Sequence, residues 1–390
     1  MKKETRVTHP PEVKPPEGNV PVVTPVYRSV KFTYPTIEAS LTPEAKESGF
    51  DYTRDSNPTT RELELTAAEL QDRDDAIAVG SGMAAIWLAL LGNLESGDRV
   101  VIFVESYRPN RIAVRRFLPK LGIEFTMLSV HDHDAIAREF ADARTKLVLF
   151  EAPTNPMLQV PDLEKIVALA KQHNVVTVLD NTFAGLHNHG RFEIDYFVHS
   201  LTKYASGHGD VLGGIVIADE KRIRALKPLA VNMGSTLDPG AAFLIARGLK
   251  TYFVRFREHS ASALRVAEFL ARREEVARVF YPGLPSDPGH ALARKQMGEF
   301  GGVLSFDLKA SKERTWAFID ALELFTTTSS LGSTESLVAP AQLYLGTDLT
   351  ADEQKRAQIK DCTVRLAVGL EHVDDLLADL DQSLRKTVSA

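Results

Sequence analysis

The sequence predicts an α/β fold with a mostly parallel sheet, helices on both of its faces, and a smaller α+β domain at the C-terminal end. Between residues 76 and 217, short apolar runs alternate with helical patterns, as in sheets that are buried on both faces. After about residue 250 this alternation stops, and a long helical pattern leads into mixed strands and helices. A chain of 390 residues is long enough for two such domains.

The expected elements of the main sheet follow from hydrophobic period and length. The expected strands are Ala76–Val79, Arg99–Val104, Lys146–Phe150, Val175–Leu179, Tyr196–Val198 and Gly214–Ile217. The helices expected between them are Gly82–Leu94, Arg108–Leu121, Asp134–Ala141 and Leu163–His173. A capping-box pattern at residues 59–62 predicts that a further helix begins there.

The segments on either side of this region differ in character. Residues 1–50 hold eight of the 20 prolines, which fix φ and disfavour helices, so we expect an extended arm. Its apolar stretch Val20–Tyr27 indicates that part of the arm docks on a protein surface. Beyond the main domain we expect a long helix at Leu249–Ala271 and strands at Gly302–Leu308 and Val364–Val368. The expected division is an arm over 1–58, an α/β domain over 59–248 and an α+β domain over 249–390.

Composition excludes several classes of function. The net charge is −6, so no overall basic field favours nucleic acid or an anionic membrane. No apolar run approaches the roughly 20 residues that span a bilayer, and the N-terminus lacks a signal-peptide pattern. Cys362 is the single cysteine, which excludes internal disulfides and cysteine-based metal sites. We expect a cytoplasmic protein without a metal site.

Candidate functional residues follow the expected strands, at the edge where parallel sheets bind ligands. Gly80–Ala85 opens a helix with small residues, which suits a phosphate group, although it also fits a simple glycine turn. Asp180 ends an apolar strand, where a carboxylate needs a cationic partner unless it caps a helix. Lys203 lies among hydroxyls and glycines, where burial would lower its pKa and make its amine nucleophilic. Asn155 lies in a loop between two prolines that could aim its side chain.

Taken together, these features fit pyridoxal 5'-phosphate. The phosphate would bind at the helix start, and the aldehyde would form a Schiff base with Lys203. Asp180 would keep the pyridine nitrogen protonated, which makes the ring an electron sink.

Ordered motifs across nearly the whole chain carry a family resemblance. They include Tyr52-Thr53-Arg54, Ser81-Gly82-Met83-Ala84, Pro153-Thr154-Asn155-Pro156, Asp180-Asn181-Thr182-Phe183, His199-Ser200-Leu201-Thr202-Lys203-Tyr204, Arg247-Gly248-Leu249-Lys250-Thr251, Tyr281-Pro282-Gly283-Leu284 and Ser330-Leu331-Gly332. On these motifs the chain resembles the Cys/Met-metabolism family of pyridoxal-phosphate enzymes. That family includes cystathionine γ-synthase, cystathionine γ- and β-lyases and methionine γ-lyase.

The resemblance implies an aspartate-aminotransferase-type fold (fold type I) and a role for each site residue. Lys203 would hold the cofactor and move protons, Asp180 would pair with the ring nitrogen, and Tyr107 would stack on the ring and act near the leaving group. The other implied cofactor-binding residues are Gly82, Met83, Thr182, Ser200 and Thr202, and the implied substrate-binding residues are Asn155, Ser330 and Arg365. Tyr52 and Arg54 would reach the phosphate of a neighbouring subunit, so the resemblance implies a homo-oligomer, at least a dimer and usually a tetramer.

The implied reaction is γ-elimination or γ-replacement on a γ-substituted L-α-amino acid. Substrates of this kind are cystathionine, methionine, O-acylhomoserine, or a γ-oxygen analogue such as canavanine. The alternative is β-elimination on a sulfur amino acid, although Ser330-Leu331-Gly332 favours γ-chemistry because β-lyases often carry Ser-Trp-Gly. The chain departs from the family at Arg108-Pro109-Asn110, at Ser329 and at Asp238, an acid that could attract a cationic substrate side chain.

Three rival classes fit less well. Ser200-Leu201-Thr202-Lys203 matches the S-x-x-K string of serine acyl-transferring enzymes, but the K-T-G and S-D-N elements are absent. A dehydrogenase is disfavoured because Leu212 breaks the G-x-G-x-x-G spacing after Gly207. A non-catalytic protein on the same fold would not need Lys203, Asp180 and Tyr107 together.

Overall fold

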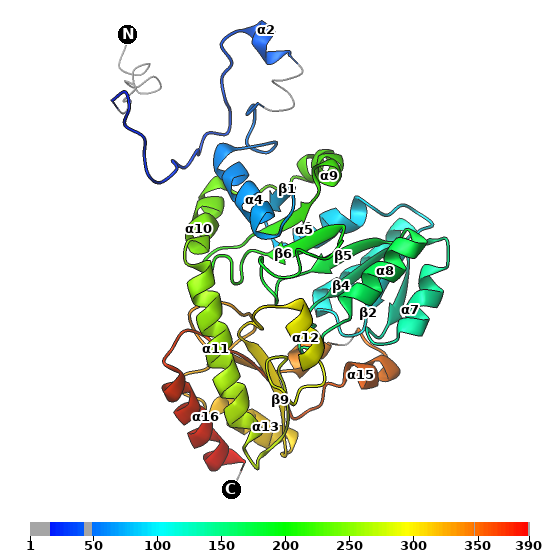
Figure 1. Cartoon of the computed structure of the whole chain (residues 1–390), viewed down its shortest axis with the longest axis vertical. Helices are drawn as coiled ribbons and strands as arrows, with labels where there is room; N and C mark the ends of the chain where they lie inside the picture. Colours follow the sequence, from blue (N-terminus) through cyan, green and yellow to red (C-terminus); the bar gives the residue numbers. More distant parts are fainter. Residues whose placement is uncertain (1–15, 43–48, 347, 389–390) are drawn as a thin grey trace.

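The computed structural model describes residues 16–42, 49–346 and 348–388, which form two sheet-containing units and an N-terminal arm (Figure 1). The larger sheet has seven strands in the order β1-β7-β6-β5-β4-β2-β3. Their bounds are β1 (Asp75–Val79), β2 (Arg99–Phe103), β3 (Glu124–Leu128), β4 (Thr145–Glu151), β5 (Val176–Asp180), β6 (Tyr196–Ser200) and β7 (Gly214–Ala218). Strand β7 runs in the opposite direction to the other six strands, so the predicted mostly parallel sheet is confirmed.

Helices cover both faces of this sheet. One face packs against α5 (Gly82–Leu91) and α9 (Glu220–Met233). The other packs against α4 (Pro58–Leu70), α7 (His133–Phe140), α8 (Leu163–His173) and α10 (Pro239–Leu249). Near-complete burial of strands such as β4 and β7 explains their continuous apolar sequences. Strand β3 was not predicted from the sequence. It lies at the sheet edge and is only partly buried, so it lacks the continuous apolar run of the central strands.

Three local predictions need correction. The capping box at residues 59–62 is wrong, because Asn57 caps α4 by accepting a hydrogen bond from Thr59 N at 2.9 Å, with Pro58 in the first turn. The helix expected at Arg108–Leu121 is three short pieces, α6 (Arg108–Ile112), a π turn (Ala113–Phe117) and a 3-10 turn (Leu118–Leu121). The helix expected at Leu249–Ala271 begins later, as α11 (Tyr252–Ala271), after α10 ends.

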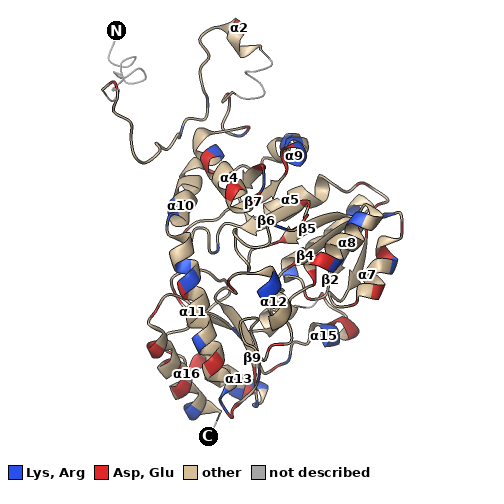
Figure 2. Ribbon diagram, viewed as in Figure 1, with Lys and Arg blue, Asp and Glu red and all other residues tan. Residues whose placement is uncertain are grey.

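The smaller sheet has five strands in the order β10-β11-β12-β9-β8. Their bounds are β8 (Val276–Phe280), β9 (Val303–Leu308), β10 (Thr326–Thr327), β11 (Leu337–Pro340) and β12 (Thr363–Ala367). Its core packs against α11, α13 (Lys312–Asp320) and α16 (Val373–Thr387), and the remaining helices are α12 (His290–Gln296), α14 (Gln342–Leu345) and α15 (Ala351–Ala357). Charged residues of both signs occur along α11 and α16 (Figure 2).

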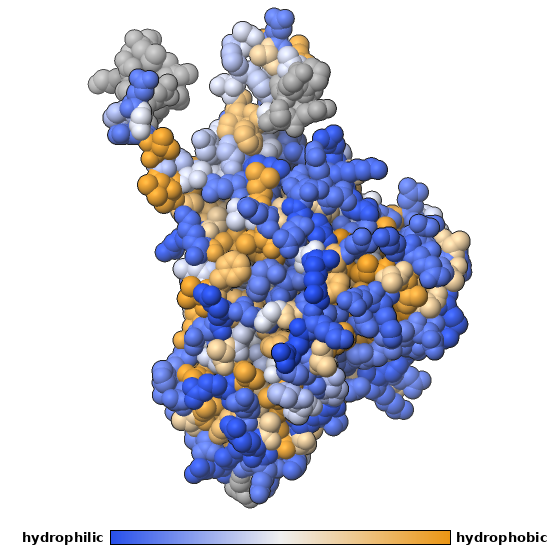
Figure 3. Space-filling model, in the orientation of Figure 1, coloured by the Kyte–Doolittle hydropathy of each residue, from blue (hydrophilic) through white to orange (hydrophobic). Residues whose placement is uncertain are grey.

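The arm extends away from both sheets, and its described residues carry one short helix, α2 (Ile37–Ser40) (Figure 1). Its apolar side chains are exposed, with Val20 at 84% and Val22 at 101% of their full accessible surface. Figure 3 shows apolar residues on the arm where it leaves the body. The part of the arm before residue 16 lies outside the described residues. Among the described residues, no helix combines the length and apolar character needed to cross a membrane.

Candidate active site

Eleven of the predicted site residues line one cavity of about 250 Å³ between the two sheets. They are Gly82, Met83, Tyr107, Asn155, Asp180, Thr182, Ser200, Thr202, Lys203, Ser330 and Arg365. Asp180 and Ser200 end β5 and β6, Gly82 begins α5, and Arg365 belongs to β12 of the smaller sheet. The ligand edge of the parallel strands and the C-terminal unit therefore face each other across this cavity.

Lys203 presents a partly neutralised amine to the cavity. Its Nζ donates a hydrogen bond to Ser330 Oγ at 2.7 Å. Burial, followed by the nearby positive charge of Arg365, lowers the pKa of Lys203 to about 8. The unprotonated amine, which is the form that attacks an aldehyde, is therefore far more abundant near neutral pH than in an ordinary lysine, although the protonated form still predominates at pH 7.

Asp180 is held by neighbouring groups at the end of β5. Its Oδ1 accepts hydrogen bonds from Thr182 Oγ1 at 2.7 Å and from Thr182 N at 3.2 Å, and its Oδ2 accepts one from Asn110 Nδ2 at 3.4 Å. Burial raises the pKa of Asp180, which these hydrogen bonds oppose. Thr182 therefore orients the carboxylate, a role the resemblance alone did not specify.

The start of α5 forms a tight cradle for an anion. Ser81 caps the helix, because its hydroxyl accepts a hydrogen bond from Ala84 N at 3.2 Å. The backbone N–H groups of Gly82 and Met83 lie in the first turn, where N–H groups have no partner within the helix and can bind an anion. A side chain at position 82 would place its Cβ 2.9 Å from the Cβ of Ser200, so glycine is needed for this approach. Thr202 Oγ1 accepts a hydrogen bond from Gly213 N at 3.1 Å, which fixes the hydroxyl beside the cradle.

Arg365 occupies the opposite wall. Its Nη2 donates to Ser330 O at 3.2 Å, and its guanidinium lies 4.6 Å from the ring centre of Tyr344 and 5.3 Å from that of Phe183. Ser330 has a φ of 129°, unusual for a residue with a side chain, and so turns its hydroxyl to Lys203 and its carbonyl to Arg365. The Nε of Arg365 is buried without a hydrogen-bond partner among the described residues, so the fork formed by the N–H groups of its guanidinium can still bind a carboxylate.

Two polar residues of the cavity, Glu151 and Tyr344, were not singled out in the sequence. Glu151 ends β4, and its Oε1 accepts a hydrogen bond from Tyr107 N at 2.5 Å. Tyr344 comes from α14, far along the chain from the cofactor motifs. Glu151 followed an expected strand and could have been identified by the same strand-end argument, whereas Tyr344 had no local signal.

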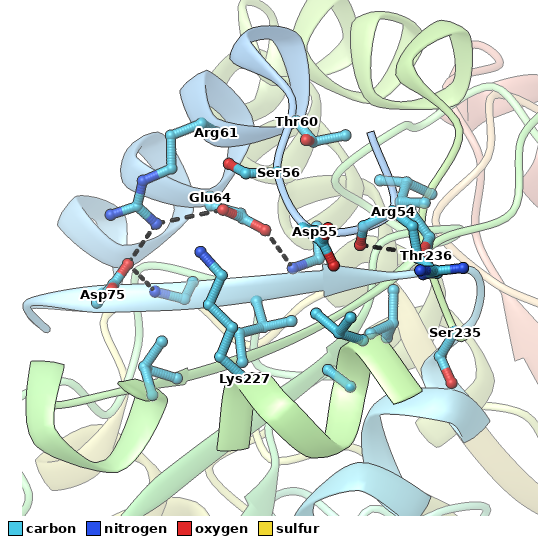
Figure 4. A pocket seen from close by; sticks show the side chains of 18 of the residues that line it. Arg54, Asp55, Ser56, Thr60, Arg61, Glu64, Asp75, Lys227, Ser235 and Thr236 are labelled. Atoms are coloured by element: carbon cyan, nitrogen blue, oxygen red, sulfur yellow. Dashed lines mark hydrogen bonds and ion pairs between the residues drawn. The ribbon is translucent and has the colours of Figure 1, made fainter. Parts of the chain in front are cut away.

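Tyr52 and Arg54 are absent from the lining of this cavity. Tyr52 is 38% exposed, and the Arg54 guanidinium lies 5.2 Å from the centre of its ring. Arg54 instead lines a second cavity, of about 370 Å³, between the arm, α4, β1 and α9 (Figure 4). In that second cavity Arg61 Nη1 pairs with Asp75 Oδ1 at 2.5 Å.

Asp238 also lies apart from the Lys203 cavity. Its Oδ1 accepts hydrogen bonds from Gly240 N at 2.8 Å and Ala241 N at 3.2 Å, which caps α10. This capping role explains the presence of an acidic residue at position 238, so no contact with a substrate is needed to explain it.

The residues present fit pyridoxal phosphate. The cradle at Gly82 would hold a phosphate, and the side-chain oxygen of Asn155 is buried without a partner among the described residues. Asp180 would meet the ring nitrogen, and Lys203 offers a nucleophilic amine on the same cavity wall.

A family model described as Cys/Met metabolism PLP-dependent enzyme matches residues 4–385. The chain belongs to this family. It is a pyridoxal-phosphate-dependent enzyme with the lyase or transferase chemistry of that family, and the fold-type-I prediction is confirmed by its structural neighbours.

Relatives named for different reactions share similar sequence identity with this chain. It is 38% identical to "L-methionine gamma-lyase" of Fusobacterium nucleatum subsp. polymorphum, over 93% of each chain. It is 35% identical to "Cystathionine beta-lyase" of Coxiella burnetii, over 98% of this chain and 97% of the relative. The crystal structure of cystathionine gamma synthase from Xanthomonas oryzae pv. oryzae, in complex with aminoacrylate and cysteine, superposes with a TM-score of 0.89 at 35% identity over 94% of each chain. Elimination or replacement on sulfur amino acids is therefore the common chemistry.

Proposed function

We propose that this enzyme catalyses γ-elimination or γ-replacement on a γ-substituted L-α-amino acid. The observation that carries the proposal is the hydrogen bond from Lys203 to the hydroxyl of Ser330, rather than to a carboxylate. An amine held by a neutral partner can leave it and serve as a base at two successive carbon atoms, as γ-chemistry requires. Leu331, beside it in the cavity wall, supports the same reading because it replaces the tryptophan frequent in β-lyases.

The proposed roles of the other residues follow from their places in the cavity. When bound, pyridoxal phosphate withdraws electrons and makes the substrate protons next to the amino group acidic. Lys203 would remove the proton at Cα and would have to give that proton up before it removes one at Cβ, while Arg365 and Asn155 would hold the α-carboxylate. Burial and the charges of Asp180 and Glu151 raise the pKa of Tyr107, so its phenol keeps a proton to donate to the leaving atom.

We also propose that two chains complete each site. Neither Tyr52 nor Arg54 lines the cavity of its own chain, and the arm that carries them projects from the body with exposed apolar side chains. A homodimer would place them at the partner's phosphate cradle, and a tetramer would bury more of the arm. We further propose that the arm ends at residue 58, that the two domains divide at residue 248, and that the enzyme is cytoplasmic.

Product analysis on cystathionine tests the reaction. γ-Elimination releases cysteine and 2-oxobutyrate, whereas β-elimination releases homocysteine and pyruvate. We expect 2-oxobutyrate from cystathionine and from methionine, or a γ-replacement product when O-acylhomoserine is supplied with a thiol. Pyruvate as the sole keto acid would establish the β-lyase alternative, which the relative from Coxiella burnetii supports. The capped Asp238 gives no support to a substrate with a basic tail, so canavanine is a comparison substrate.

A further inference from the structure

Two acidic side chains lie next to each other at the ligand edge of the large sheet. Glu151 and Asp180 are direct partners in the β4–β5 ladder, and both line the Lys203 cavity. Two ionised carboxylates at such a buried place repel each other, so one of them is favoured to keep its proton. Burial, followed by the charge of Asp180, raises the pKa of Glu151 to about 8. This raised pKa favours the neutral form of Glu151 near pH 7.

Asn110 bridges the two acids. Its Nδ2 donates to Glu151 Oε1 at 3.2 Å and to Asp180 Oδ2 at 3.4 Å, and the side chain is fully buried. Its own Oδ1 has no hydrogen-bond partner among the described residues. An unpaired buried carbonyl lowers stability, so packing alone does not account for an asparagine here.

The bridge reaches the tyrosine as well. Glu151 Oε1 also accepts the hydrogen bond from Tyr107 N, so a single carboxyl oxygen is bonded to both the start of α6 and the Asn110 amide. A shift of Glu151 would displace the tyrosine backbone and the support of Asp180 together.

We propose that Asn110 is a positioning residue that, braced by its hydrogen bond to Glu151, holds the Asp180 carboxylate against the ring nitrogen of the cofactor. This inference rests on the proposed pairing of Asp180 with that nitrogen, but it does not depend on whether the reaction is of the γ or the β type. The charged and titratable groups that face the two acids are Arg111 and Tyr107 from the α6 region and Lys203 after β6, and Arg365 from β12 acts in turn on Tyr107 and Lys203.

The test uses holoenzyme and two readouts other than turnover. The first is the dissociation constant of pyridoxal phosphate, measured by equilibrium dialysis. The second is the pH midpoint of the visible absorbance band of the lysine-bound cofactor, which responds to the charge on the ring nitrogen. In Asn110→Ala we expect the dissociation constant to rise roughly tenfold, and the midpoint to move away from its wild-type value.

Paired variants separate the bridge from a general loss of structure. Asn110→Thr keeps one hydrogen-bond donor and is expected to fall between wild type and Asn110→Ala in both readouts. Glu151→Gln keeps an acceptor without a charge, so its midpoint is expected to lie closer to wild type than that of Glu151→Ala. Asn232→Ala is the matched surface control, because Asn232 is exposed and donates only to Pro228 O within its own helix.

The outcomes are distinct. Wild-type affinity and midpoint in Asn110→Ala would overturn the inference, and a larger midpoint shift in Glu151→Gln than in Glu151→Ala would overturn the neutral state of Glu151. If Asn110→Ala does not fold, the comparison is made between Asn110→Thr and wild type, where unchanged readouts again reject the bridge. If the wild type shows a normal absorbance band but forms no γ-products, the proposed function is contradicted and the inference about Asn110 is not.

Discussion

Arg111 and Asp348 form a buried ion pair that joins α6, beside the Lys203 cavity, to the C-terminal unit. Arg111 Nε donates to Asp348 Oδ2 at 2.9 Å, and both side chains are 1% exposed. The same guanidinium donates through Nη2 to Leu345 O at 2.8 Å and Tyr344 O at 3.1 Å. Arg111 therefore clamps the segment whose Tyr344 ring lies against Arg365.

Breaking this clamp should lower stability strongly. In Arg111→Met, Asp348 loses its closest buried cationic partner, which costs about 3–5 kcal/mol in comparable pairs. We expect the urea midpoint of unfolding to fall clearly at a fixed protein concentration. Arg144→Met is the control, because Arg144 pairs with Asp142 and Glu124 at the surface and should change the free energy of unfolding by about 1 kcal/mol or less. Equal midpoints in the two variants would contradict a structural clamp.

Removal of the lysine amine should abolish both the spectrum and the reaction. We expect Lys203→Ala to lose the visible absorbance band and to lower kcat about a thousandfold or more, because it removes the nucleophile and the proposed base together. Lys171→Ala, on the outer face of α8, should retain both properties. A persistent band in Lys203→Ala would show that the cofactor is attached elsewhere.

The lowered pKa of Lys203 predicts how the apoenzyme responds to pH. Its amine reacts with an aldehyde when neutral, so the rate of cofactor incorporation should rise as pH passes through about 8 and then level off. Between about 8 and the ordinary value of 10.5, the unfolded chain binds more protons at this lysine than the folded chain, so this group makes stability rise with pH in that window. Stopped-flow absorbance would measure the rate, and a rate independent of pH would refute the assignment.

The fork of Arg365 should govern substrate binding. Arg365→Lys keeps the positive charge but loses two-pronged contact with a carboxylate, so we expect KM to rise roughly tenfold or more with a smaller change in kcat. Steady-state kinetics on the best substrate measures the split. A fall in kcat at unchanged KM would instead assign Arg365 to the chemical step.

Mixed oligomers test whether two chains build each site. Arg54→Ala and Lys203→Ala should each be poorly active alone, since one weakens the phosphate site and the other removes the amine. When the two are co-expressed as a homodimer with shared sites, about one site in four is intact by random pairing, because half of the dimers are mixed and each has one unaltered site. Recovery of activity to that order supports the shared site. No recovery, despite mixed dimers shown by differential tags, would place Arg54 at its own chain's site.

Local sequence determined much of this protein. Apolar runs such as Lys146–Phe150 and Val175–Leu179 were recognisable because a strand buried on both faces must be apolar throughout, and the polar residues after them indicated a ligand edge. Residues such as Asp180 and Lys203 could be identified in this way because their chemistry is unusual at the end of an apolar strand.

Tertiary structure decided what depends on residues distant in the chain. Arg111 falls within the helix expected at Arg108–Leu121 without any local sign of burial, and its buried partner Asp348 lies 237 positions away. The pairing of Glu151 with Asp180, and the place of Asn110 between them, follow from strand register and from the approach of α6, neither of which leaves a local pattern. Hydrophobic period and turn chemistry act over a few residues, so sequence alone predicts the elements and their polar ends. The energetics of buried charge depend on which elements meet, and only the folded chain determines that.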